Sequence, residues 1–217
     1  MSRYSKIRSL IAVTVLALVT PLLAVAEEAF VEGTHYIKLD QPVRTRDASK
    51  VEVVELFWYG CSHCYAFEPL IKQWKKSMPA DVDFWQSPAM WNANMKTHAQ
   101  MFYATEVLGV RDKVHDAIFT AMNVERKRLA NVNEIAAFLA DYGVDSQEFK
   151  KTFKSFSVNS QVNQADARAR SYKITGTPEV VVNGKYRVSG SSAGGQAEML
   201  KVVDFLIAKE RANLVAK

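Results

Sequence analysis

The chain has little cysteine: only two of its 217 residues, Cys61 and Cys64. A small exported domain held together by disulfides uses several cysteines spread along the sequence, so that class of fold is excluded. Two cysteines three positions apart close almost no loop, and a bridge between them would add little stability. Their presence therefore indicates chemistry rather than a structural crosslink.

An excess of charge of one sign is also lacking. The formal net charge is +5, but three of the 28 basic residues and none of the 23 acidic ones lie in the first 26 positions, so the rest of the chain carries +2. Basic residues are scattered, with one short cluster at 126–128. This balance gives no support to a nucleic-acid partner.

The first 26 residues have the pattern of a cleaved secretory signal. Basic residues precede an apolar run at 10–19, Thr20-Pro21 interrupts it, and the segment ends in the small residues Ala24-Val25-Ala26. A membrane anchor is the alternative, but a spanning helix needs roughly 20 apolar residues. We predict cleavage after Ala26, which leaves 191 residues, enough for one core or for a core with an inserted subdomain.

Hydrophobic periodicity predicts the element order β-α-β, a helical block, then β-β-α. We expect an edge strand at 36–39, a strand buried on both faces at 51–59, a helix from Cys61 and a strand at 82–85. Apolar stripes at helical spacing then run from 92 to 173. Asn183-Gly184 between two β-rich runs is a strong hairpin signal, and a last helix covers 195–212. The predicted fold class is α/β.

The motif Cys61-Ser62-His63-Cys64 opens a helix directly after the buried strand. This position places two sulfurs within bonding reach and points backbone N–H groups at the first sulfur. Such a site favours the thiolate, which is both the reacting species and the better leaving group. His63 adds a polar or positive partner. The motif therefore predicts a redox-active Cys61–Cys64 disulfide.

Other uses of a cysteine pair fit the residues less well. A c-type haem site needs histidine directly after the second cysteine, where this chain has Tyr65. Zinc needs two further ligands, but there is no second cysteine pair, and His35, His98 and His115 lie in unrelated patterns. An inert structural disulfide is the remaining alternative. We expect no metal and no cofactor, and we assign these three histidines no role.

Two further positions are informative. Glu55 lies in the middle of the apolar strand. If its side chain is buried, its pKa would be raised and it could exchange a proton with Cys64. A position at a strand edge, with the side chain in solvent, is an equal alternative.

Thr177-Pro178 precedes a strand, and proline has no N–H to donate to a sheet. Only about 5% of X–Pro bonds are cis, so the residues alone predict an ordinary strand-start proline.

Together these features resemble the DsbA family of bacterial periplasmic disulfide oxidoreductases, which have a thioredoxin fold. The resemblance rests on the strand-Cys-x-x-Cys-helix unit, on Pro69 in that helix, on the hairpin proline, on the long helical block and on the string FWYGCSHCYAFE at 57–68. It implies a thioredoxin fold with an inserted α-helical subdomain. The halves of the fold would be residues 27–91 and 174–217, with the subdomain at 92–173.

The resemblance also implies roles for single residues. Cys61 would be the exposed nucleophile that forms mixed disulfides, Cys64 the buried resolving thiol, and His63 the histidine that stabilises the thiolate. Ser62 departs from the family, which most often has proline there, and this dipeptide tunes the redox potential.

Four residues outside the motif also match family positions. Glu55 and Glu68 match acidic residues near the active site, which favours the proton relay. Pro178 matches the cis-proline that faces the cysteines, and Thr177 the residue whose backbone helps to hold a substrate.

The function implied is donation of the disulfide to reduced exported proteins in the periplasm by a monomeric enzyme. A DsbB-type membrane quinone reductase would reoxidise it. We expect a strong oxidant. One alternative is a periplasmic reductase or isomerase, although only about 25 residues separate Glu27 from the first core strand, too few for the usual dimerisation domain. A non-catalytic binding or chaperone module is the other.

Overall fold

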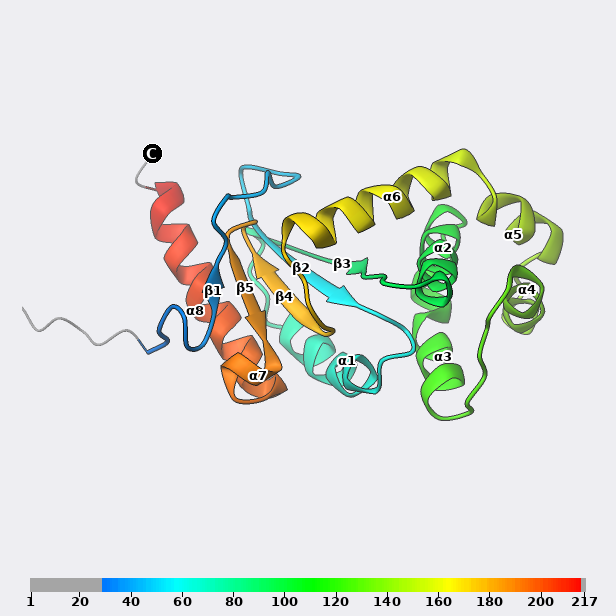
Figure 1. Cartoon of the computed structure of the whole chain (residues 1–217), viewed down its shortest axis with the longest axis horizontal. Helices are drawn as coiled ribbons and strands as arrows, with labels where there is room; N and C mark the ends of the chain where they lie inside the picture. Colours follow the sequence, from blue (N-terminus) through cyan, green and yellow to red (C-terminus); the bar gives the residue numbers. More distant parts are fainter. Residues whose placement is uncertain (1–28, 216–217) are drawn as a thin grey trace, which may run out of the picture.

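A five-stranded mixed sheet lies at the centre of the computed structural model, which describes residues 29–215 (Figure 1). The predicted signal segment and its cleavage site lie outside the described residues. The strand order is β1-β5-β4-β2-β3. The strands are β1 (Ile37–Lys38), β2 (Val51–Phe57), β3 (Val82–Pro88), β4 (Glu179–Val182) and β5 (Tyr186–Ser189). Only β2 and β3 pair in parallel; the other neighbours are antiparallel.

The central strand β2 is buried along its whole length, as its nearly continuous apolar sequence predicts. Its residues belong to two hydrophobic clusters, one on each face of the sheet. Val51 and Val53 pack in the cluster that includes residues of α1 (Ser62–Lys75) and α8 (Gln196–Val215). Val54 and Leu56 pack on the opposite face with Tyr172, at the end of α6 (Phe156–Ser171). Both faces of the sheet are therefore covered by helices.

Five helices follow one another between β3 and β4 and lie beside the sheet (Figure 1). They are α2 (Ala93–Val107), α3 (Arg111–Asn123), α4 (Val132–Ala140), α5 (Ser146–Phe153) and α6. They fall within the segment 92–173, whose status as a separate subdomain stays a prediction. Their hydrophobic core continues into the sheet, because it includes Phe57, Tyr59 and Cys64. The cysteine motif thus lies where the helical block meets the sheet.

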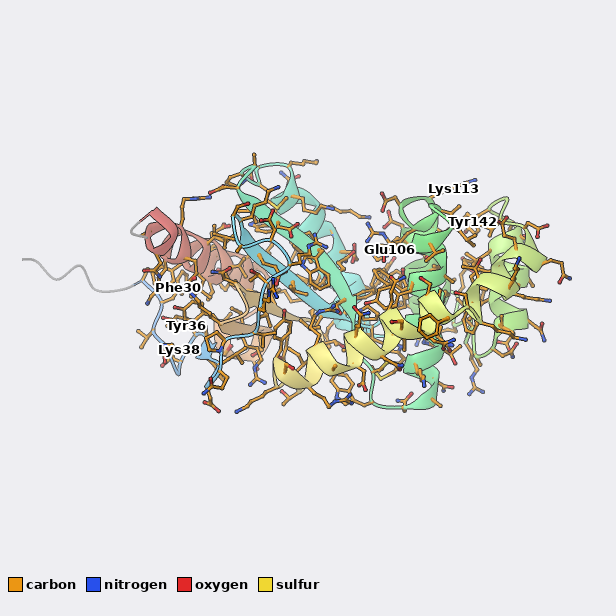
Figure 2. The ribbon with its side chains drawn as sticks, turned by 90° about the horizontal axis from the view of Figure 1, so that it is seen from above. Phe30, Tyr36, Lys38, Glu106, Lys113 and Tyr142 are labelled. Atoms are coloured by element: carbon orange, nitrogen blue, oxygen red, sulfur yellow. The ribbon has the colours of Figure 1, made fainter. Side chains whose placement is uncertain are left out.

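Different contacts hold the chain together at the two ends of the molecule, the α8 end and the helical end, which Figure 2 shows from above. At the α8 end, the Phe30 ring packs edge-on against Phe205 with centroids 5.6 Å apart. At the helical end, Lys113 Nζ donates to the backbone oxygen of Tyr142 at 2.6 Å and so ties α3 to the end of α4. No helix among residues 29–215 is both long and apolar enough to cross a bilayer.

The hairpin between β4 and β5 turns at Asn183-Gly184, as predicted. Both residues have positive φ angles, 51° and 61°, which suit a tight two-residue turn. A Cβ atom on Gly184 would lie 2.0 Å from the Val43 backbone oxygen, so only glycine fits. After β5 the short helix α7 (Gly190–Ala193) leads into α8. Pro178 directly precedes β4, and the antiparallel pairing of β4 with β2, with Glu179 opposite Leu56, places it at the end of β2 that leads into the motif.

Candidate active site

Cys61 is the N-cap of α1. Its backbone is extended, with φ −89° and ψ 115°, and its Sγ accepts a hydrogen bond from the Cys64 backbone N–H at 3.4 Å. The turn that leads into the helix is closed by the Cys61 N–H, which donates to the Trp58 carbonyl at 3.0 Å. Any side chain on Gly60 would collide with the Trp58 ring, 2.4 Å away. The first sulfur therefore sits at a helix N-terminus, as predicted.

The two thiols are free and differ in environment. The side-chain hydrogen bond with Cys64 is the main cause that lowers the pKa of Cys61 to about 5, and a side-chain hydrogen bond with Thr177 lowers it further. Burial raises the pKa of Cys64 well above its ordinary value, and the hydrogen bond with Cys61 adds to the rise. At neutral pH Cys61 is a thiolate and Cys64 a thiol.

The loop before β4 completes the front of the site. The Thr177–Pro178 peptide bond is cis, as the resemblance implied and as proline statistics alone did not predict. The Thr177 carbonyl oxygen lies 3.3 Å from Cys61 Sγ, although the two residues are 116 positions apart in sequence. The fold therefore brings Thr177, Pro178 and the cysteine pair together.

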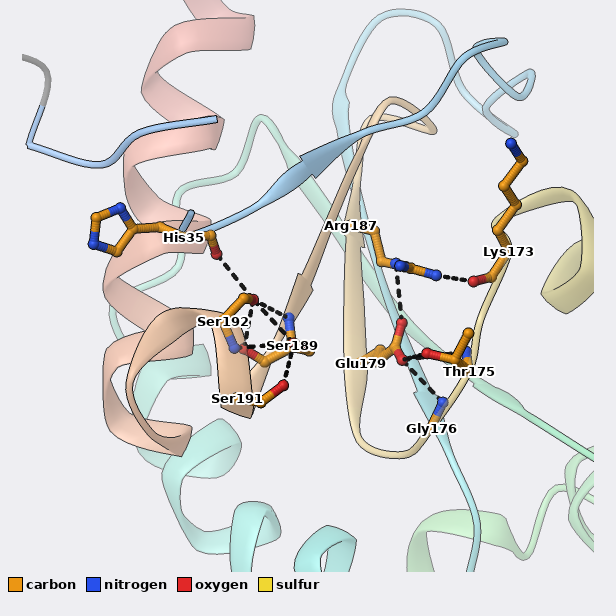
Figure 3. A network of polar contacts seen from close by, with 9 residues as sticks. All are labelled: His35, Lys173, Thr175, Gly176, Glu179, Arg187, Ser189, Ser191 and Ser192. Carbon is orange, nitrogen blue, oxygen red and sulfur yellow. Dashed lines mark hydrogen bonds and ion pairs between the residues drawn. The ribbon is translucent and has the colours of Figure 1, made fainter. Parts of the chain in front are cut away.

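Glu179 holds this loop in place (Figure 3). One of its carboxylate oxygens, Oε1, accepts hydrogen bonds from the Thr175 N–H at 3.2 Å, the Thr175 hydroxyl at 3.1 Å and the Gly176 N–H at 2.9 Å. The other, Oε2, faces Arg187 Nε at 3.4 Å. Burial raises the pKa of Glu179, and Arg187 opposes the rise. Sequence reasoning missed this residue; a carboxylate opening an apolar strand was the available signal.

A groove of about 800 Å³ runs beside the motif. His63, Thr177, Pro178 and Gln196 are among the residues that line it. The His63 side chain is exposed at this groove, while the His63 carbonyl accepts a hydrogen bond from Gln196 Nε2 at 2.6 Å. Through its backbone N–H, His63 also helps to lower the pKa of Cys61, after the larger contribution of the Cys64 side chain.

Glu55 and Glu68 meet behind the motif. Both are buried, Glu55 completely, so the edge-facing alternative for Glu55 is wrong. Gln86 Nε2 donates to Glu55 Oε2 at 2.8 Å and to Glu68 Oε1 at 2.9 Å, while Glu55 Oε1 has no hydrogen-bond partner. Burial first, and then the charge of Glu68, raise the pKa of Glu55 to about 8. Glu55 is therefore mostly neutral at pH 7.

Two of the histidines without a predicted role are buried and bonded through both ring nitrogens. His115 lies 3.2 Å from Glu68 Oε1 and 2.8 Å from the Tyr59 hydroxyl. His98 Nδ1 accepts from Trp58 Nε1 at 2.9 Å. Within residues 29–215 no cluster of three or more His, Cys, Asp and Glu side chains could hold a metal ion.

Ser62 is the first residue of α1 and is exposed. Proline suits a first helical position, and the extended backbone of Cys61 suits a residue before proline. We expect Ser62→Pro to raise the free energy of unfolding of the reduced protein by about 0.4–1 kcal/mol, because it restricts the unfolded chain. Urea unfolding measures this, with Ser62→Ala as the control that removes the hydroxyl alone. A destabilised proline variant would contradict the expectation.

Known proteins resemble this chain along most of its length. A family model described as a DSBA-like thioredoxin domain matches residues 70–198, which begin just after the cysteine motif. The thiol:disulfide interchange protein DsbA of Pseudomonas aeruginosa is 46% identical over 207 residues, 94% of this chain and 98% of the relative. That of Burkholderia cepacia is 40% identical over 79% of this chain and 80% of the relative.

Solved structures agree with the sequence relatives. The crystal structure of Pseudomonas aeruginosa DsbA has a TM-score of 0.82 and 48% identity, covering 85% of this chain and 96% of that one. The oxidoreductase DsbA of Xylella fastidiosa has a TM-score of 0.79 and 33% identity, covering 84% of this chain and 98% of that one. These matches confirm the predicted thioredoxin fold.

Proposed function

This chain belongs to the DsbA family and is a thiol–disulfide oxidoreductase that introduces disulfide bonds, and we propose that Cys61 and Cys64 carry out the transfer in unequal roles. The observation that carries the proposal is the opposite perturbation of the two thiols. The hydrogen bond with Cys64 brings the pKa of Cys61 to about 5, whereas burial raises that of Cys64. Cys61, which is partly exposed, is thus the nucleophile, and the buried Cys64 is the resolving thiol.

In the proposed cycle the oxidised enzyme carries a Cys61–Cys64 bond. A substrate thiolate attacks the Cys61 sulfur, the bond breaks and Cys64 leaves as a thiolate. A second substrate thiolate then attacks the substrate sulfur of the mixed disulfide, and Cys61 leaves as a thiolate. The low pKa of Cys61, which its contact with Cys64 mainly causes, makes it a good leaving group and favours transfer to the substrate.

We assign substrate binding to the groove beside Cys61. Thr177 and Pro178 line it and lie against the reacting sulfur, so the Thr177 backbone can hold an extended segment of the substrate. His63 lies at the same groove and is assigned to stabilising the thiolate, with its backbone N–H as the contact that supports this role.

Glu55 and Glu68 are assigned to a proton relay. When Cys64 leaves as a thiolate in a buried site, it needs a proton, since burial favours the neutral thiol. Glu55 is neutral at pH 7, because burial and the charge of Glu68 bring its pKa to about 8. Its proton can therefore pass to Cys64, whose pKa burial holds still higher.

We propose that the enzyme acts on exported proteins, which its membership of the DsbA family supports. We propose that it works in the periplasm as a monomer after cleavage at Ala26, needs no cofactor of its own and is reoxidised by a DsbB-type membrane quinone reductase. Cys61 needs an external oxidant after each cycle, because the second step leaves both thiols reduced.

The equilibrium constant with glutathione tests the direction of the reaction. We expect a reduction potential well above the about −270 mV of thioredoxin. A value near that of thioredoxin would favour the reductase or isomerase alternative. Alkylation trapping in cells separates the alternatives again: an oxidase is mostly oxidised and an isomerase mostly reduced. Unaffected substrate folding in a Cys61→Ser strain would indicate a binding module.

A further inference from the structure

Glu179 is a buried acidic residue in the middle of the sheet, directly after the cis-proline Pro178. The register of β4 places it opposite Leu56 of β2 and Ser189 of β5, and it is only 4% exposed. Burying a carboxylate costs free energy unless hydrogen bonds and a counter-charge compensate, and a well-packed apolar side chain is often as stable. Stability alone therefore does not account for a carboxylate at this position.

The Glu179 side chain binds the segment that leads into the cis-proline (Figure 3). Its Oε1 accepts hydrogen bonds from the N–H and the hydroxyl of Thr175 and from the N–H of Gly176. These two residues directly precede Thr177, whose carbonyl oxygen lies 3.3 Å from Cys61 Sγ. One carboxylate oxygen therefore fixes the backbone that positions Thr177 at the reacting sulfur.

Arg187 of β5 supplies the counter-charge. It is paired with Val181, two residues after Glu179, so the Arg187 and Glu179 side chains lie on the same face of the sheet. Arg187 Nε lies 3.4 Å from Glu179 Oε2, and Arg187 Nη1 donates to the carbonyl oxygen of Lys173, where the same segment begins. The Glu179–Arg187 pair therefore holds the segment 173–179 near both of its ends.

The segment held in this way meets both the substrate groove and the nucleophile. The Glu179–Arg187 pair and Thr177 all line the groove of about 800 Å³. A segment that is ordered before the substrate arrives lowers the entropy cost of binding. The hydrogen bond with Cys64 contributes most to the low pKa of Cys61, and the hydrogen bond with Thr177 is the next contribution that lowers it. The position of Thr177 therefore affects binding and reactivity together.

We propose that Glu179 is a positioning residue of the reaction: with Arg187 as its counter-charge, it holds Thr177 against the Cys61 sulfur and keeps the substrate-binding edge of the groove preformed. The inference rests on the nucleophile and the substrate groove proposed above. Glu179 acts through Thr177 and not on the sulfur itself. Loss of its carboxylate loosens the segment, which weakens substrate binding and makes the Cys61 thiolate less stable.

The pH profile of alkylation of the reduced protein by iodoacetamide tests the inference, because it reports the Cys61 thiolate, with an expected wild-type midpoint of about 5. Glu179→Met removes the acceptor and should raise the midpoint by about 0.5–1 pH unit, the equivalent of one hydrogen bond. Glu179→Gln keeps an oxygen that can accept from the same donors, so its midpoint should stay close to that of the wild type.

Single turnovers of the oxidised protein with a reduced two-cysteine peptide measure substrate binding. The peptide concentration that gives half the maximal rate should rise roughly three- to tenfold in Glu179→Met, with a smaller change in the maximal rate. Glu179→Gln should restore most of the difference. A general loss of stability does not produce this combination of a shifted pH profile, weaker peptide binding and rescue by glutamine.

Glu52→Met is the matched control, because Glu52 is another buried carboxylate of the sheet and lies at the start of β2, away from the motif. It should leave the midpoint and the peptide concentration unchanged. Thr175→Val removes one of the three donors from an exposed side chain, and should shift both quantities less than Glu179→Met and in the same direction. It decides the question if Glu179→Met does not fold.

Two results would overturn the positioning role of Glu179: wild-type values in Glu179→Met, or in Thr175→Val where that variant decides, and an equal shift in Glu52→Met. A wild-type midpoint near 9, the ordinary value for a cysteine, would instead overturn the assignment of Cys61 as the thiolate nucleophile. The two failures are therefore distinguishable.

Discussion

Replacing Cys61 with serine is expected to abolish disulfide transfer, whereas replacing Cys64 with serine is expected to leave a Cys61 that forms mixed disulfides but has no disulfide of its own to donate. All of the transfer passes through the Cys61 sulfur, so Cys61→Ser should lose activity by on the order of 10³-fold or more, down to uncatalysed exchange. The oxidation of a reduced substrate protein in the presence of glutathione disulfide measures this loss.

Cys64→Ser cannot form the Cys61–Cys64 bond that the enzyme donates. Its Cys61 thiolate can still attack the disulfide of an oxidised substrate, one substrate sulfur leaves as a thiolate, and no Cys64 is present to release the mixed disulfide. The side-chain hydrogen bond with Cys64 is the main cause of the low pKa of Cys61, and a serine hydroxyl in its place can still donate to that sulfur, so the Cys61 thiolate should remain available. Mixed disulfides should then accumulate at Cys61 when the variant is given an oxidised substrate protein, and they should appear by mass spectrometry after acid quenching. Ser62→Ala, an exposed change in the same motif, should accumulate none. Mixed disulfides in Cys61→Ser would reverse the assigned roles.

The sequence predicted those parts of the site that depend on local patterns. The buried strand, the helix that begins at the motif and the Asn183-Gly184 turn each follow from neighbouring residues. The cis bond at Pro178 followed only from family resemblance, because the residues alone favour trans.

The remaining parts depend on pairings between distant segments. Gln86 reaches Glu55 because β2 and β3 pair in parallel with these two residues opposite each other, a register that no single segment specifies. His115 meets Glu68 only because α3 packs beside α1. A lone histidine on a helix has the same sequence pattern whether it is buried or exposed. The contact between His115 and Glu68 could therefore be found only from the structure.

Glu55→Gln is expected to stabilise the reduced protein in a strongly pH-dependent way. Burial raises the pKa of Glu55 from 4.5 to about 8, with a further contribution from the charge of Glu68. Between these pH values the unfolded chain has lost the proton that the folded protein still holds, so the free energy of unfolding falls as pH rises from about 4.5 to 8. Glutamine has no proton to lose, and its side-chain carbonyl can still accept from Gln86.

The gain should be on the order of 3 kcal/mol at pH 7 and close to zero at pH 4, at about 1.4 kcal/mol for each pH unit of the difference. Urea unfolding at both pH values measures it, and Glu125→Gln, an exposed carboxylate, should change neither value by more than about 0.5 kcal/mol. An equal gain at pH 4 and pH 7 would mean that packing, not ionisation, is responsible. The same variant should also open its disulfide more slowly than the wild type. A Glu55→Gln protein that is more stable but reacts more slowly would indicate that Glu55 supplies a proton at a cost in stability.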